Sequence, residues 1–373
     1  MVVKLTLDDA IYNAGVLGLC KIFDHAGLPY KRDGQTIEFK ESNLEGFSEH
    51  YFSYLIKEHA NDTSYAKLIS LQIETVKDEK QLTQLNDTIE NAKKWLTSNS
   101  YKNTYPFLTD VSFDFLEAAN KLKKITLKKN QSIEDVQTDI KEMINLLSEI
   151  ITHLRHPNAK RYLVPRILSY NLIQGFWTNV SFLHKSANKK DIYKTYDEYF
   201  TNAALAFLEK KKDEKKYSKN KFHCAACENK MATASEAFDL TWLQRVGVDA
   251  ARKSSHYWDH QRDIFICPVC NLVYSCLPLG FKMAKGKGFF INNNRSIDEL
   301  ISVNSVSLSD GKQEVTRDEL ESMAYYKIID FMINQAESRK EMEIENIQIV
   351  KYDRELETRP YTFNILSRHK LML

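Results

Sequence analysis

The sequence is organised around two stretches, Cys224-Ala225-Ala226-Cys227 and Cys267-Pro268-Val269-Cys270. Each has two residues between its cysteines, a spacing that lets one tight turn aim both sulfurs at the same point. The 39 residues between the pairs, 228–266, exceed the spacer of about 15–20 residues in a plain zinc ribbon, so this spacer must fold as an insertion. We therefore predict an inserted zinc module in which one Zn²⁺ is held by Cys224, Cys227, Cys267 and Cys270.

The donor set decides what such a metal does. Four thiolates complete the tetrahedral shell of zinc and leave no position for a catalytic water, so the metal supports the fold. Four thiolates also suit an iron–sulfur cluster, which remains the alternative cofactor. His223 and Cys276 lie beside the two pairs, but using either as a ligand would break the regular spacing. Cys20 falls in an apolar helical pattern, which predicts a small core residue.

The composition places this module in a larger, helix-rich protein. The chain has 373 residues, 43% of them hydrophobic and 27% charged, with 11 Gly and 7 Pro, which predicts two or three packed units rather than a disordered or turn-dense all-β chain. No signal-peptide pattern opens the chain, and no run of about 18 apolar residues occurs in it. Six cysteines in so long a chain do not resemble a disulfide framework. We expect a cytoplasmic protein that makes no membrane contact.

Hydrophobic periodicity predicts an α+β, helix-rich fold with a mixed N-terminal domain, a helical middle and the inserted four-cysteine zinc module. Helical periods occur in residues 11–23, 82–96, 140–154, 193–212 and 320–336, with Pro157 stopping the third of these helices. Strand patterns occur at residues 2–7, 37–39, 264–266, 273–274, 347–349 and 361–363. The expected segments are a mixed α/β N-terminal unit (1–110), a helical basic region (111–221), the zinc-binding insertion (222–291) and a helix and strand return segment (292–373).

The positive charge is concentrated in the middle of the chain. Residues 121–230 carry 22 Lys or Arg and 12 Asp or Glu, whereas the whole chain has a net charge of only +2. Aromatic and amide side chains follow one basic group, Phe176 and Trp177 among them, and these could stack on or bond to a nucleic-acid strand. Lysine and arginine clusters supply affinity for phosphates, and a solvated helix face is the alternative. The predicted phosphate-binding residues are Arg155, Lys160, Arg161 and Arg166.

A second candidate nucleic-acid contact follows the second cysteine pair. Here glycines alternate with lysines and precede aromatic and amide residues, so the loop could approach a phosphate backbone or enter a groove. No nucleotide-binding glycine motif is present, and an ordinary hairpin turn is the alternative. The candidate residues are Lys282, Lys285, Lys287, Asn292, Asn293 and Asn294.

Histidine and aspartate residues inside the spacer raise a different possibility, a metal-dependent nuclease of the HNH type. Asp259 and His260 form the required pair of residue types. However, His260 lies only seven residues before Cys267, which leaves no room for the loop and second strand of such a site. The nuclease therefore remains the alternative function, together with a zinc-bearing scaffold that has no role with nucleic acid.

Four further motifs, in this order, resemble one known family: the zinc-motif-containing large subunit of the type I-B CRISPR Cascade, the crRNA-guided surveillance complex. They are residues 10–18 (AIYNAGVLG), 266–272 (ICPVCNL), 278–281 (PLGF) and 289–293 (FFINN), and they accompany the two cysteine pairs. The family usually continues into a helical bundle similar to the small subunit, whereas this sequence ends at Leu373, soon after Tyr361 and Phe363.

The resemblance implies a non-enzymatic antiviral role. Members of the family inspect the protospacer-adjacent motif in target double-stranded DNA, help to open the duplex, and recruit the helicase-nuclease that cuts it. The implied partners are other Cascade subunits, the crRNA, the target DNA and that recruited helicase-nuclease. The four cysteines remain the expected structural zinc site, and no catalytic residue is expected.

Overall fold

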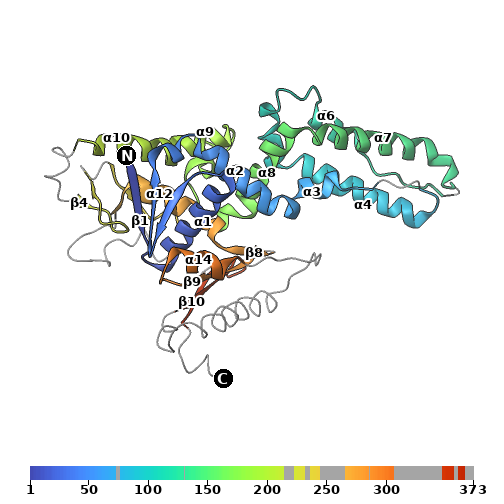
Figure 1. The fold of residues 1–373 in the computed structure, drawn as a ribbon. Coiled ribbons are helices and arrows are strands. Elements are labelled where there is room, and N and C mark those ends of the chain that lie inside the picture. The colour runs from blue at the N-terminus through green and yellow to red at the C-terminus, as the bar shows by residue number, and fades with distance from the viewer. Residues whose placement is uncertain are drawn as a thin grey trace, which may run out of the picture. The chain divides into compact units, whose positions relative to one another are not determined.

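A computed structural model describes residues 1–72, 76–129, 131–213, 222–231, 236–243, 265–284, 286–305, 347–356 and 360–365. Figure 1 shows the course of the chain through a helix-rich α+β fold, which confirms the predicted class. The predicted helix at 320–336 and the pair Asp259 and His260 lie outside the described residues. Within the described part of the chain, no helix is both long and apolar enough to cross a membrane.

The chain forms two compact units, and their boundaries differ from those of the four segments expected from the sequence. Unit 1 contains residues 1–54, 172–184 and 193–373, and unit 2 contains residues 55–171 and 185–192. Unit 1 therefore contains both the N-terminal strands and the strands of the return segment, which are distant in sequence. The boundary falls within helix α2 (Phe47–His59).

Unit 1 begins with a three-stranded antiparallel sheet in the order β1-β3-β2. Its strands are β1 (Val2–Thr6), β2 (Tyr30–Asp33) and β3 (Thr36–Lys40), followed by the 3₁₀ turn η1 (Glu41–Leu44). Helix α1 (Ala10–Ala26) connects β1 to β2, with Asp9 as its N-cap and Gly27 ending it in the left-handed conformation. Every residue from Ala10 to Cys20 is buried, so the predicted amphipathic helix is in fact a central helix surrounded by protein.

A second antiparallel sheet, in the order β11-β10-β9-β8, joins the strands on either side of helix α14 (Ile297–Asn304). Two small two-stranded sheets, β4-β5 and β6-β7, lie in the cysteine module. The strands are β4 (Phe222–His223), β5 (Lys230–Met231), β6 (Phe238–Asp239), β7 (Phe265–Ile266), β8 (Lys282–Ala284), β9 (Lys287–Asn292), β10 (Gln348–Asp353) and β11 (Tyr361–Ile365). The strands predicted around 347–349 and 361–363 are therefore confirmed.

The remaining helical elements of unit 1 enclose a buried aromatic cluster. They are η5 (Ile173–Gly175), η6 (Ser181–Leu183), α9 (Ile192–Tyr196), the π-helical segment η7 (Asp197–Thr201), α10 (Asn202–Lys211), α12 (Pro268–Ser275), α13 (Leu277–Gly280) and α14 (Ile297–Asn304). Tyr51 donates to the carbonyl oxygen of Ser275 at 3.2 Å, and the hydroxyls of Tyr196 and Ser275 lie 2.6 Å apart. These bonds satisfy hydroxyl groups that burial removes from water, and they fix α12 against α2 and α9.

All regular elements in the described residues of unit 2 are helical. Its elements are η2 (Ala60–Asp62), α3 (Ser64–Ile69), α4 (Glu79–Leu96), α5 (Asn99–Lys102), η3 (Tyr105–Phe107), α6 (Phe115–Lys121), η4 (Glu134–Val136), α7 (Gln137–Leu154) and α8 (Pro157–Asn171). Helices α4 and α7 confirm the two predicted from the 3.6-residue period. Pro157 does not stop α7, which has already ended at Leu154; it begins α8, where its missing N–H costs no hydrogen bond.

Candidate metal centre

The first cysteine pair lies on a tight turn between β4 and β5. The N–H of Cys224 donates to the carbonyl of Asn229 at 2.9 Å, and the N–H of Glu228 donates to the carbonyl of Cys224 at 2.9 Å. Glu228 has a φ of 54°, the left-handed conformation that closes such a turn. The turn brings Cys224 and Cys227 to the same side of the hairpin, where both belong to the four-cysteine group.

The second pair occupies the N-terminus of α12. Cys267 is the N-cap residue, its sulfur accepts the N–H of Cys270 at 3.5 Å, and Pro268 takes the first helical position. The strand predicted at Val273 and Tyr274 is wrong, because both residues lie in this helix. Their β-propensity is overridden by the N-cap and by burial of the whole helix from Pro268 to Ser275.

The four cysteine sulfurs form one compact group. All of them lie within 4.8 Å of one another, and the sulfurs of Cys227 and Cys267 are 3.7 Å apart. A tetrahedron with metal–sulfur distances of about 2.3 Å has edges of about 3.8 Å, so this separation fits zinc coordination and is far longer than a disulfide bond. All six cysteines are free thiols. The geometry confirms the predicted convergence on a metal-binding site that is compatible with zinc.

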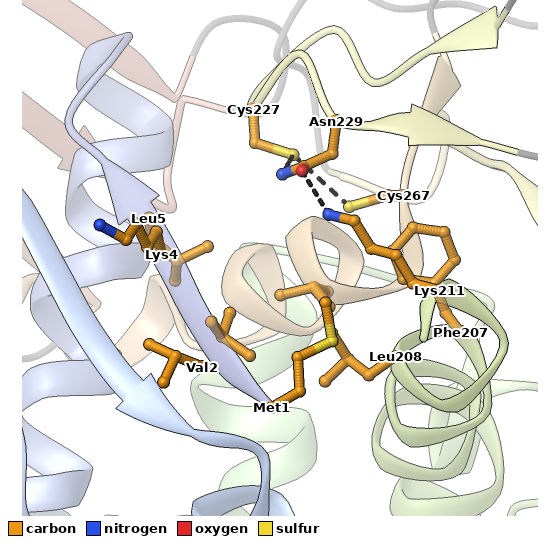
Figure 2. Close-up of a pocket in the computed structure, with 12 residues that line it drawn as sticks. Met1, Val2, Lys4, Leu5, Phe207, Leu208, Lys211, Cys227, Asn229 and Cys267 are labelled. Atoms are coloured by element: carbon orange, nitrogen blue, oxygen red, sulfur yellow. Dashed lines mark hydrogen bonds between the residues drawn. The ribbon is translucent and has the colours of Figure 1, made fainter. Parts of the chain in front are cut away.

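Hydrogen-bond donors surround these sulfurs. The N–H of Cys267 donates to the sulfur of Cys224 at 3.2 Å, and the side-chain amide of Asn229 donates to the sulfur of Cys227 at 3.0 Å (Figure 2). The hydroxyl of Tyr12 lies 3.5 Å from the sulfur of Cys270, within hydrogen-bond distance, and burial raises the pKa of Tyr12 well above its ordinary value. Such donors orient metal ligands and disperse thiolate charge.

The thiols themselves need a cation. Hydrogen bonds from the other three cysteines lower the pKa of Cys224, whereas hydrogen bonds to Cys224 and Cys227, followed by burial, raise the pKa of Cys267. Burial disfavours a full set of four thiolates at one point unless a cation lies beside them. A divalent metal would supply that positive charge, and a closed four-sulfur shell suits a structural rather than a catalytic metal. Cys20 and Cys276 are buried and lie outside this group.

Helix α1 packs against the cysteine-bearing segment at unusually close range. A Cβ added to Gly18 would lie 2.2 Å from the carbonyl oxygen of Cys276, and one added to Gly280 would lie 2.0 Å from the carbonyl oxygen of Ala14. Only glycine lets the two backbones approach so closely. The motifs at residues 10–18, 266–272 and 278–281 are therefore parts of one interface inside unit 1.

Three consecutive asparagines complete this interface: Asn292 ends β9, and Asn293 and Asn294 follow it. The side-chain amide of Asn13 donates to Oδ1 of Asn292 at 2.9 Å, and the amide of Asn292 donates to Gln348 at 3.3 Å. Asn293 donates to Glu299 at 3.0 Å, and exposed Asn294 donates to the carbonyl of Asp8 at 3.4 Å. Asn292 and Asn293 are buried, which disfavours the predicted contact with a DNA groove; that contact stays a prediction. Their amides hold α1, β9 and α14 together.

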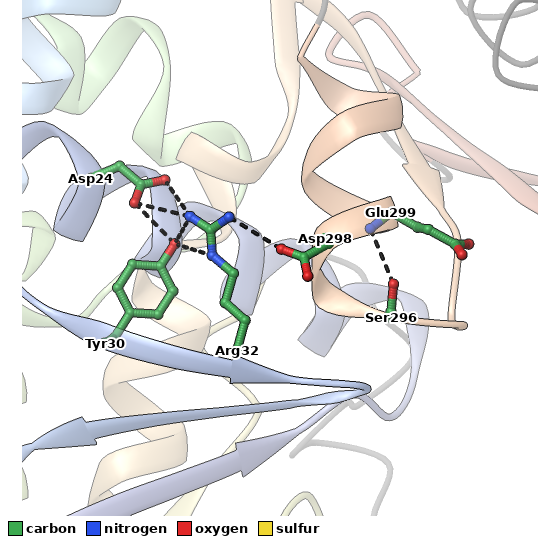
Figure 3. A network of polar contacts seen from close by, with 6 residues as sticks. All are labelled: Asp24, Tyr30, Arg32, Ser296, Asp298 and Glu299. Carbon is green, nitrogen blue, oxygen red and sulfur yellow. Dashed lines mark hydrogen bonds and ion pairs between the residues drawn. The ribbon is translucent and has the colours of Figure 1, made fainter. Parts of the chain in front are cut away.

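An exposed ion network joins the same helices from outside. Arg32 on β2 donates to Asp24 at the end of α1 and to Asp298 in the first turn of α14, each at 3.2 Å (Figure 3). The hydroxyl of Tyr30 donates to Asp24 at 3.0 Å. Ser296 caps α14 by accepting the N–H of Glu299. The network orients the segment that follows the asparagines.

Lys282 and Lys287 of the predicted glycine loop lie on β8 and β9, which pair as an antiparallel hairpin. Lys287 pairs with Asp353 at 3.6 Å and with Glu355 at 3.2 Å. Lys282 is half-buried on β8, and Lys285 lies outside the described residues. The geometry of Lys287 favours a role in joining β9 to the end of β10.

The basic group of unit 2 divides into surface and interior. Arg155 and Lys160 are exposed, and the guanidinium of Arg161 lies 5.3 Å from the ring centre of Tyr162. Arg166 is only 1% exposed and donates to the carbonyl of Lys190 at 2.6 Å, so the prediction that it meets a phosphate does not fit this position. It lies seven residues after buried Ala159, on the inward face of α8.

The aromatic residues expected to stack on nucleic acid are also interior. Phe176 and Trp177 are fully buried in unit 1, where the ring of Trp177 packs against Trp242 at 5.7 Å. The sequence did not predict that Tyr12 and Asn229 contact the cysteine sulfurs, or that Asn13 bonds to Asn292. Tyr12 and Asn13 belong to the motif at residues 10–18, but no local pattern indicates that their partners lie more than 250 residues away.

Comparison with known proteins supports the metal module. The family model described as CRISPR-associated protein (Cas_CXXC_CXXC) matches residues 217–282, a range that contains both cysteine pairs. None of the curated proteins and none of the solved structures compared matches the chain. The family match and the clustered sulfurs together support a CRISPR-associated protein with a four-cysteine cluster.

Proposed function

We propose that this protein is the non-catalytic large subunit of a crRNA-guided Cascade complex of the type I-B kind. The observation that carries the proposal is the convergence of the cysteine pairs with the motifs at residues 10–18, 278–281 and 289–293 in one buried assembly. A match limited to residues 217–282 supports the CRISPR association. The large-subunit role rests on the wider set of motifs, since these are distant in sequence and share one core.

In this role the protein inspects the protospacer-adjacent motif in target double-stranded DNA, aids duplex opening and recruits the helicase-nuclease. Its partners are other Cascade subunits and the crRNA, and it acts in the cytoplasm. The surface of unit 2 offers phosphate contacts from Arg155, Lys160 and Arg161. Half-buried Tyr162 stacks with Phe107, their rings 5.9 Å apart, beside that basic group. Cations at the surface beside aromatic rings suit backbone binding without sequence preference.

The absence of catalysis is part of the proposal. Four sulfurs close the shell around the proposed Zn²⁺, which leaves no open position for an attacking water. When bound, the metal supplies a cross-link between the β4–β5 turn and the start of α12. The chain's own residues then hold α12 against α1.

Co-expression with the neighbouring subunits and a crRNA tests the proposal. The tagged chain should copurify with both, and the assembled complex should bind target duplex DNA and leave it uncut in Mg²⁺ or Mn²⁺. The double variant Asp259→Ala, His260→Ala should retain target interference. Metal-dependent cleavage by the wild type that this variant loses would establish the HNH-like nuclease. If the protein neither copurifies with the crRNA nor binds DNA, the result favours a zinc-bearing scaffold without a role with nucleic acid.

A further inference from the structure

A groove runs along β1 in unit 1, beside the cysteine cluster; we call it the β1 groove (Figure 2). Its volume is about 250 Å³. Its lining residues are Met1, Val2 to Leu5 of β1, Phe207, Leu208 and Lys211 of α10, and Cys227, Asn229, Cys267 and Val269 of the cysteine module. One wall is therefore a strand, the opposite wall a helix, and the metal-binding turns form the end between them.

The strand wall has backbone groups that no other described residue pairs with in its sheet. β1 lies at one edge of its sheet, and among the strands that the structure describes it pairs only with β3. Met1 accepts the N–H of Glu41, and Leu7 donates to Gln35, so the odd-numbered residues exchange hydrogen bonds with β3. Bonding alternates along an antiparallel pair, and the N–H and C=O groups of Val2 and Lys4 therefore point away from β3. Such an edge is a template for another strand.

The helix wall adds a cation and apolar surface. The ammonium of Lys211 lies in the groove and donates to Oδ1 of Asn229 (Figure 2). In the described residues no carboxylate forms an ion pair with Lys211, whereas Lys4 pairs with Glu38. Phe207 and Leu208 pack below it and are almost fully buried. The groove thus offers edge-strand hydrogen bonds, apolar contacts and one positive charge that a carboxylate would complement.

We propose that the β1 groove docks an extended segment of a partner protein, which adds a strand to β1 and places an acidic side chain against Lys211. A strand between a sheet edge and a helix is an established mode of peptide recognition. The volume is below the roughly 300–1,000 Å³ of small-molecule pockets, which suits one side chain of a peptide lying along the edge. This proposal does not depend on DNA or RNA binding, and its failure would leave the proposed function unchanged.

Lys4→Pro tests the strand contact. Proline removes the outward N–H at this position, and it is tolerated on an edge strand whose N–H faces away from its neighbour. Lys4→Ala is the matched control, because it removes the same ion pair with Glu38 and keeps the N–H. Both variants should bind metal and unfold at similar temperatures, since the bonds to β3 belong to the odd-numbered residues.

The probe is a phage-displayed library of random decapeptides, selected on the full-length, metal-loaded protein. Selected peptides should carry Asp or Glu, bind Lys4→Ala like the wild type, and bind Lys4→Pro at least tenfold more weakly. Lys211→Glu should reduce their affinity more than Lys211→Met, which keeps most of the apolar stem. Equal enrichment on the wild type and Lys4→Pro, or no enrichment on either, overturns the proposal. Selected peptides that bind Lys211→Glu as tightly as the wild type also overturn the proposal. If another part of this chain or a second copy of it occupies the groove, no peptide will be enriched.

Discussion

Unit 1 and unit 2 place the residues that stand out in the sequence in opposite positions. In unit 1 the cysteines, the glycines of α1 and the asparagines after β9 are mostly interior, and they join segments from both ends of the sequence. In unit 2 most of the conspicuous basic residues, such as Arg155 and Lys160, are on the surface of helices that follow one another along residues 55–171. Substitutions in unit 1 should therefore change stability and metal content, and those on the surface of unit 2 should change binding.

Cys267→Ser should produce the largest effect. Structural zinc contributes about 10–16 kcal/mol of apparent binding free energy in small zinc modules, so loss of one ligand should release the metal and unfold the cysteine module. Elemental analysis should show one zinc per chain in the wild type and almost none in the variant. Hydrogen exchange should accelerate in α12 and stay slow in α7, because α7 belongs to unit 2.

Cys276→Ala is the matched control for that experiment. Cys276 is fully buried next to α12 but lies outside the four-sulfur group. Its loss should cost about 1 kcal/mol of stability and leave the zinc content unchanged. Full zinc retention in Cys267→Ser, or equal loss in both variants, would contradict the assignment of the ligands.

Gly18→Ala should follow in size. Its Cβ would lie 2.2 Å from the backbone oxygen of Cys276, and neither α1 nor the segment before α13 can move without opening the core. Overpacking of this kind costs about 1–3 kcal/mol, and more where the backbone must shift. We therefore expect the free energy of unfolding, measured in urea, to fall by about 3 kcal/mol or more.

Gly27→Ala is the matched control, since a Cβ at that position meets nothing within 4 Å. Its left-handed φ of 67° should cost about 1–2 kcal/mol. Equal losses of stability in Gly18→Ala and Gly27→Ala would show that close packing at Gly18 does not explain its effect.

The local signals of the sequence were sufficient for the cysteine site and for the long helices. Two residues between cysteines fix a knuckle within a single turn, so the ligands could be identified without knowing the fold. The five apolar positions predicted in residues 82–96 are the buried positions of α4, because a helix repeats its inward face every three to four residues. Both inferences depend on neighbours in sequence.

Inferences that needed a distant partner failed. An asparagine such as Asn292 has the side chain of a base-reading residue, but in the structure this side chain bonds to Asn13 and Gln348. Val273 and Tyr274 have strand propensity, but Cys267 caps a helix that includes them. Arg166 stands among exposed basic residues, and only the helical spacing from Ala159 and Leu163 shows that it shares their buried face. Charge and residue type alone do not show which side of a helix faces water.

Asn292→Ala sharpens the same comparison at a smaller scale. The substitution removes two hydrogen bonds, one accepted from Asn13 at 2.9 Å and one donated to Gln348 at 3.3 Å, and each is worth about 0.5–1.5 kcal/mol. The amide of Asn13 keeps its bond to the carbonyl of Asp8 at 3.1 Å. We expect a loss of about 2 kcal/mol in the free energy of unfolding and no change in DNA-motif preference of the assembled complex. Asn294→Ala, at an exposed position, should cost less than about 1 kcal/mol. A change in motif preference at normal stability would return Asn292 to the DNA interface.

The smallest effect is expected on unit 2, where Arg155→Ala with Lys160→Ala tests the proposed phosphate contacts. Each lost contact should reduce the slope of log affinity against log salt by about 0.9, and affinity should fall equally for every duplex sequence. Titrations of the assembled complex at several salt concentrations measure both quantities. Lys121→Ala is the control, because Lys121 is also an exposed residue of unit 2 but pairs with Glu117 at 2.7 Å; its slope should match the wild type. An unchanged slope in the double variant would assign Arg155 and Lys160 to the fold or to a protein partner, since Arg155 already donates to the carbonyl of Ile69 at 3.2 Å.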